Sequence, residues 1–63
     1  MTQKERVVLT MKVRKIAEDL RELEYLAIAA GTNVYDLEYP FDECIAKKIQ
    51  VLQKWSETIY NNK

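Results

Sequence analysis

One stretch of the chain decides the fold: residues 9–30, which read LTMKVRKIAEDLRELEYLAIAA. Its apolar side chains recur at alternating steps of four and three residues, at Leu9, Val13, Ile16, Leu20, Leu23, Ala27 and Ala30. This spacing is typical of a helix that packs along one seam. Gly31 follows directly and favours a helix end, because glycine adopts the left-handed conformation at no steric cost. The pattern therefore predicts a helix over residues 4–30.

A second amphipathic segment follows a predicted connection at residues 31–40. Pro40 suits the first turn of a helix, and Asp42 and Glu43 would place negative charge near the helix N-terminus. The apolar stripe of this segment consists of Phe41, Ile45, Ile49, Leu52, Trp55 and Ile59, with Cys44 beside it as a small buried hydrophobe. We expect a second helix over residues 41–60. The fold class that follows is all-α: a single domain, residues 1–63, folded as a two-helix antiparallel hairpin.

The hairpin has an expected core and an expected partner. Folding the second helix back on the first pairs Leu23 with Ile49, Leu20 with Leu52 and Ile16 with Trp55. Two helices leave one side of each apolar stripe in water, and a chain of 63 residues usually needs further burial to be stable. We therefore predict a homodimer that forms a four-helix bundle. The apolar residues outside the main seam are the predicted self-association surface: Val7, Val8, Met11, Tyr25, Leu26 and Ile28.

The residue inventory argues against enzyme chemistry. The chain has no histidine and only one cysteine, so it lacks the commonest catalytic base and the usual zinc ligands. Its lone cysteine cannot form an intrachain disulfide, and no secretory leader pattern opens the sequence, which favours the cytoplasm. We expect no catalytic residue, no cofactor, no metal and no membrane span. The function we expect is that of a small non-enzymatic interaction or regulatory protein acting through a homo-oligomeric surface.

Charge is segregated along the chain although its formal net charge is zero. Residues 1–16 carry five basic and one acidic side chain, residues 17–46 one basic and eight acidic, and residues 47–63 four basic and one acidic. In a hairpin, the first and third segments lie at the same end, so one end is basic and the other acidic. Antiparallel packing of two copies would match opposite charges. Overall neutrality predicts weak affinity for nucleic acid.

An alternative interpretation begins at residues 7–13, where Val7, Leu9, Met11 and Val13 alternate with other side chains as in a strand. A short strand followed by two helices resembles the ribbon-helix-helix family of DNA-binding dimers. The resemblance implies that Thr10 and Lys12 face the major groove, and the nucleic-acid site of this alternative consists of Thr10, Lys12, Arg14 and Lys15. The connection from Thr32 to Pro40 is longer than the tight turn of that family.

The opening residues also resemble the Rop family of RNA-binding helical hairpins. The likeness lies in Met1, Thr2, Glu5, Leu9 and Met11 and in the chain length. It implies a helical hairpin and, for the alternative function, RNA binding. Where that family places Asn, Phe and Gln in one helical column, this chain has Thr10, Arg14 and Glu18. Only the fold analogy is therefore carried over.

Overall fold

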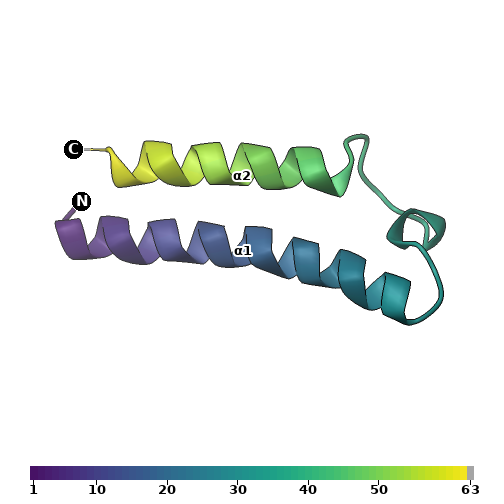
Figure 1. The fold of residues 1–63 in the computed structure, drawn as a ribbon. Coiled ribbons are helices and arrows are strands. Elements are labelled where there is room, and N and C mark those ends of the chain that lie inside the picture. The colour runs from purple at the N-terminus through teal and green to yellow at the C-terminus, as the bar shows by residue number, and fades with distance from the viewer. Residues whose placement is uncertain (63) are drawn as a thin grey trace.

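The computed structural model describes residues 1–62 as two helices folded into an antiparallel hairpin (Figure 1). Helix α1 covers Gln3–Ala29, the short 3-10 helix η1 covers Val34–Asp36, and helix α2 covers Ile45–Tyr60. Both ends of the chain lie at one end of the hairpin and the connection lies at the other (Figure 1). The predicted all-α hairpin is confirmed. Lys63, counted above in the basic segment 47–63, lies outside the described residues.

The first turn of α1 is fixed by a reciprocal pair of hydrogen bonds at Thr2. The Glu5 backbone N–H donates to the Thr2 hydroxyl at 3.1 Å, and the Thr2 N–H donates to the Glu5 carboxylate at 2.8 Å. This capping box satisfies backbone donors that a helix N-terminus leaves free, and these bonds to Thr2 lower the pKa of Glu5. From here α1 runs unbroken through residues 7–13. The alternative of an N-terminal strand is therefore wrong, because these residues form backbone bonds within a helix.

Gly31 ends α1 as the sequence predicts. Its φ of 82° is in the left-handed region, its N–H donates to the Ile28 carbonyl at 2.9 Å, and the Thr32 N–H donates to the Ala27 carbonyl at 3.0 Å. These two bonds form the helix-ending motif that favours glycine at this position. Ala30 is the cap residue, so α1 ends at Ala29 and not at Ala30.

The start of α2 differs from the prediction. The helix begins at Ile45, four residues after the predicted start at Phe41, and Cys44 is its extended N-cap residue without a side-chain hydrogen bond. The Ile45 N–H donates instead to the Tyr35 hydroxyl, 3.0 Å away. Tyr35 also contacts Tyr39 edge to face, at 4.9 Å between ring centroids, and Tyr39 contacts Phe41 in the same way at 5.4 Å. This aromatic row holds the chain in an open loop where the sequence predicted a first helical turn.

Two predictions at this junction are corrected as a result. Pro40 precedes the helix by five residues, so it does not form its first turn. Asp42 and Glu43 lie directly before the N-cap residue, so their charge stays near the helix N-terminus although neither is in the first turn. The Cys44 side chain is exposed and not buried, since a residue outside the helix does not follow the direction of the buried stripe.

The contact between Tyr35 and Ile45 leads to a first prediction. Tyr35→Phe should lower the free energy of unfolding by about 0.5–1.5 kcal/mol, because the Ile45 N–H loses its acceptor at the start of α2. Urea titration followed by circular dichroism measures the change. Tyr25→Phe is the matched control, since the Tyr25 side chain is well exposed on α1. Equal loss in both variants would show that the hydroxyl of Tyr35 does not stabilise the helix start.

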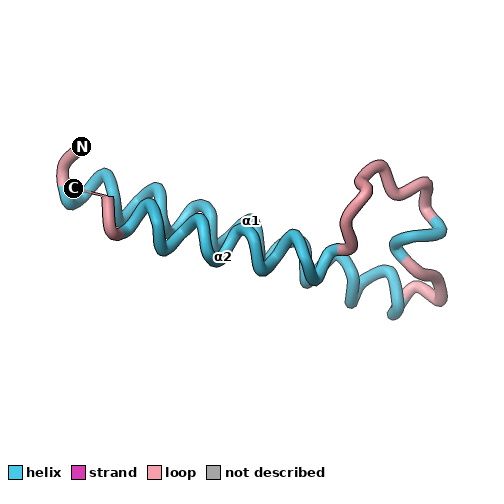
Figure 2. Tube along the Cα trace, turned by 90° about the horizontal axis from the view of Figure 1, so that it is seen from above, coloured by secondary structure: helices cyan, strands magenta, loops and turns pink. Residues whose placement is uncertain are grey.

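The core lies along the contact between α1 and α2 and continues under η1. Its buried side chains are Val13, Ala17, Ala27, Val34, Ile45 and Ile49, joined by the buried hydroxyl residues Thr10 and Ser56. Leu20, Tyr39 and Leu52 pack against this cluster and are partly buried. A second view shows α2 lying along α1, whose last turns extend beyond α2 to the connection (Figure 2). The predicted pairing of Ile16 with Trp55 places Arg14 beside Glu57. In the structure, the Arg14 guanidinium donates to the hydroxyl of the neighbouring Ser56 at 3.4 Å, one residue from that prediction.

Half of the predicted core lies outside the contact between the helices. Val13, Leu20 and Ala27 keep their predicted places, whereas Thr10 and Ala17 are buried in place of Leu9 and Ile16. Leu23 and Trp55 are exposed as well. Small side chains at Thr10, Ala17 and Ser56 allow the two helices to approach closely. The larger side chains are then left along one edge of the contact.

Candidate interaction surface

Four of the exposed residues that were predicted for the core lie, together with Val51, on one side of the hairpin. We define the apolar face as Leu9, Ile16 and Leu23 of α1 together with Val51 and Trp55 of α2. Each of these side chains is between 46% and 54% exposed. On α1 they recur every seven residues, which places them on the same side of the helix. Five large apolar side chains are therefore half in contact with water along one side of the molecule.

A shallow groove shows that the two helices contribute to the same side. It has a volume of about 270 Å³ and is lined by Leu20 of α1 and by Phe41, Glu43, Lys48, Val51 and Leu52. Ile16 and Leu23 lie one turn either side of Leu20, and Trp55 lies one turn after Val51. The Lys48 ammonium lies 4.4 Å from the centre of the Phe41 ring at the end of this groove. The apolar face thus spans both helices.

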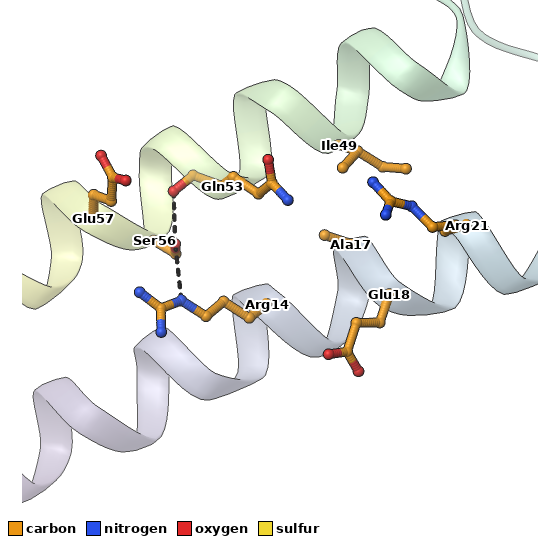
Figure 3. A pocket seen from close by; sticks show the side chains of 8 residues that line it. All are labelled: Arg14, Ala17, Glu18, Arg21, Ile49, Gln53, Ser56 and Glu57. Carbon is orange, nitrogen blue, oxygen red and sulfur yellow. Dashed lines mark hydrogen bonds between the residues drawn. The ribbon is translucent and has the colours of Figure 1, made fainter.

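The opposite side of the hairpin is polar. A groove of about 400 Å³ runs between the helices there, lined by Arg14, Ala17, Glu18, Arg21, Ile49, Gln53, Ser56 and Glu57. Arg21 and Gln53 extend into this groove from the two helices, while the carboxylates of Glu18 and Glu57 point away from it (Figure 3). The Ser56 hydroxyl donates to the Gln53 carbonyl at 2.6 Å. This side offers charged and hydrogen-bonding groups to water, in contrast to the apolar face.

The six predicted self-association residues are all exposed but lie elsewhere. Val7, Val8, Met11, Tyr25, Leu26 and Ile28 belong to α1. Helical geometry turns Val7, Met11, Tyr25 and Ile28 away from the side that carries Ile16, whereas Val8 and Leu26 lie at the outer border of that side. The sequence pattern missed Val51, although its spacing of four residues from Trp55 was a usable signal. It assigned the other four members of the apolar face to the core of the single chain.

The residues of the nucleic-acid alternative are separated by the structure. Thr10 is 2% exposed in the contact between the helices, so its side chain does not reach a nucleic acid. Lys12, Arg14 and Lys15 line a shallow depression on the outer surface of α1, together with Met11 and Glu18. Lys15 also forms an exposed ion pair with Asp19 at 3.3 Å. Three of the four predicted residues share a surface, and an acidic residue borders it.

Residues 1–62 contain neither a membrane-spanning helix nor a cluster of metal-binding side chains. Neither helix has a segment that is long and apolar enough to cross a membrane. No group of three or more side chains of the histidine, cysteine, aspartate or glutamate type is arranged to hold a metal ion in this part of the chain.

Comparison of the chain with protein-family models, with curated proteins and with solved structures found no match in any of the three.

Proposed function

We propose that this chain is a non-enzymatic interaction protein that works as a homodimer, in which the apolar faces of two copies pack together as a four-helix bundle. The observation that carries the proposal is the row of five half-exposed side chains across both helices. Clustered apolar side chains on a small protein mark a surface that another protein covers. The nucleic-acid alternative has lost its strand and Thr10, so we do not favour it.

The size of the core supports this assignment. Six apolar side chains are buried in the hairpin, and four of them are alanine or valine residues with little apolar area to bury: Val13, Ala17, Ala27 and Val34. A chain of this length buries only about 60% of the surface exposed on unfolding. The single cysteine excludes an intrachain disulfide as a substitute. Covering the apolar face with a second copy would remove five large side chains per subunit from water.

The outline of the molecule fits such an interface. The hairpin measures 44 × 21 × 14 Å, so it is a thin layer of two helices with a broad side. A broad side of this outline is comparable with the ~800 Å² that each partner buries in a standard protein interface. Two such layers, packed side to side, give the double-layer arrangement of a four-helix bundle.

Trp55 provides a direct test, because it is the only tryptophan in the chain and belongs to the apolar face. We expect light scattering to give twice the mass of the 7.5 kDa chain at micromolar concentration. On dilution, the tryptophan emission should shift to longer wavelength in step with the loss of dimer, since Trp55 becomes half exposed. A monomeric mass at about 100 µM with an unchanged emission maximum contradicts the proposal.

A matched pair of variants locates the interface. Leu9 and Met11 are two residues apart and both exposed, at 46% and 64%, but Met11 lies on the other side of α1 from the apolar face. Leu9→Ser should raise the dimer dissociation constant at least about tenfold, because burial of each of the two leucine side chains stabilises the dimer by about 1.5–3 kcal/mol. Met11→Ser should change it by less than about threefold. The reverse order would instead favour the surface that the sequence predicted.

A further inference from the structure

We infer that the apolar face binds the second copy in antiparallel orientation, with α1 packed against α1 of the partner subunit and the two-fold axis passing beside Ile16. This inference rests on the proposed homodimer and adds its geometry.

Two symmetric arrangements exist for two hairpin layers packed through the same face. In a two-fold dimer both copies use the same surface, so each contact occurs twice. If the axis runs parallel to the helices, α1 lies over α2 of the partner and all chain ends gather at one end. If the axis lies across the helices, α1 lies over α1 of the partner and the chain ends are at opposite ends.

Charge distinguishes these arrangements. Both chain ends lie at the same end of the hairpin (Figure 1). Residues 3–16 of α1 carry five basic side chains and one acidic, whereas residues 17–29 carry one basic and four acidic. The connection adds Asp36, Glu38, Asp42 and Glu43 at the far end. An axis parallel to the helices brings two basic ends together and two acidic ends together. An axis across the helices places each basic end beside an acidic end, which favours association and fixes its direction.

The pattern on α1 locates the axis. Leu9 and Leu23 are each seven residues from Ile16, so an axis beside Ile16 places Leu9 opposite Leu23 of the partner subunit. Lys12 and Asp19 lie about one turn either side of Ile16, on the edge of the apolar face away from α2. Both side chains are exposed. The same axis sets Lys12 opposite Asp19 of the partner subunit, and symmetry repeats this ion pair.

Cysteine cross-linking tests the arrangement. The exposed Cys44 is first replaced by serine, and all further cysteine variants carry this Cys44→Ser change. Under mild oxidation, Ile16→Cys should give a covalent dimer as its main product, because a disulfide requires Cα atoms that approach within about 7 Å. Leu9→Cys and Leu23→Cys should form a mixed dimer together and little covalent dimer alone. Met11→Cys, at an exposed position on the other side of α1, is the control for random collision and should remain mostly uncross-linked.

The outcomes separate this inference from the proposed function. A monomeric mass for the Cys44→Ser protein contradicts the homodimer itself. A dimeric mass with cross-links between Ile16→Cys and Trp55→Cys, and none within Ile16→Cys, contradicts only the antiparallel arrangement. That result would indicate α1 lying over α2 of the partner.

Charge exchange gives a second, independent test. Lys12→Asp and Asp19→Lys should each raise the dimer dissociation constant about tenfold at low salt, because two ion pairs between the subunits become repulsive contacts. Asp19→Lys also removes the exposed pair with Lys15 within the chain, which Lys12→Asp leaves in place. The double variant, with both changes, restores opposite charges and should return to within about threefold of the original protein. Additive losses in the double variant would overturn the pairing of Lys12 with Asp19.

Discussion

Replacing Ile45 with alanine is expected to lower the free energy of unfolding by about 2–5 kcal/mol, the largest effect of any single truncation in this chain. Ile45 is 1% exposed, the least of the apolar residues in the core. It packs in one cluster with Ala17 and Ala27 of α1 and with Val34 of η1. Removing its side chain therefore opens a cavity where both helices and the connection meet.

The expected loss is large relative to the total. A chain of this size has a free energy of unfolding of about 3–9 kcal/mol, so the Ile45→Ala protein should unfold at a much lower urea concentration. Urea titrations at one fixed protein concentration measure the change, since a dimer is stabilised by concentration. Ile28→Ala is the matched control, because Ile28 is 63% exposed on α1, and should cost less than about 0.5 kcal/mol. Similar losses in both variants would contradict the assignment of Ile45 to the core.

Placing a carboxylate on the apolar face should abolish the dimer. Ile16→Asp is expected to raise the dimer dissociation constant by at least about 100-fold, equivalent to about 2.7 kcal/mol. The inferred axis brings each new carboxylate beside its own copy, where both lose water and repel one another. Because Ile16 is half exposed in the hairpin, its contribution to the core of the single chain is smaller than that of Ile45.

Sedimentation velocity measures this change, with circular dichroism to follow helix content. Tyr25→Asp is the control, because it adds the same charge to an exposed position on the opposite side of α1 from Ile16. This control should remain dimeric. A dimer that persists in Ile16→Asp at micromolar concentration would show that the two copies meet through another surface.

Much of the fold follows from the sequence alone. The seven-residue spacing along α1 gives the helix and its length, and Gly31 gives its end through a backbone conformation that other residues rarely adopt. The register of the hairpin also follows, as the contact between Arg14 and Ser56 shows. These features depend on local backbone preferences and on chain length, which are properties of short segments.

The start of α2 depended on contacts between distant residues. Local signals at Pro40, Asp42 and Glu43 favoured an earlier start. The Tyr35 hydroxyl accepts the N–H of Ile45, ten residues further along, and the aromatic row from Tyr35 to Phe41 occupies the preceding loop. No local pattern contains the partner of such a hydrogen bond, because it forms only when the chain has folded back.

The candidate interaction surface was determined only by the way the two helices meet. The sequence established a broad apolar stripe on α1 that includes Leu9, Ile16 and Leu23, but a stripe of this width can be turned to face α2 in more than one way. The tertiary structure buries Thr10 and Ala17, because small side chains let two backbones approach and bring their neighbours into contact. The larger side chains then remain at the edge of the contact. Periodicity thus determined which residues form the apolar stripe, and packing decided which of them are buried between the helices and which remain exposed.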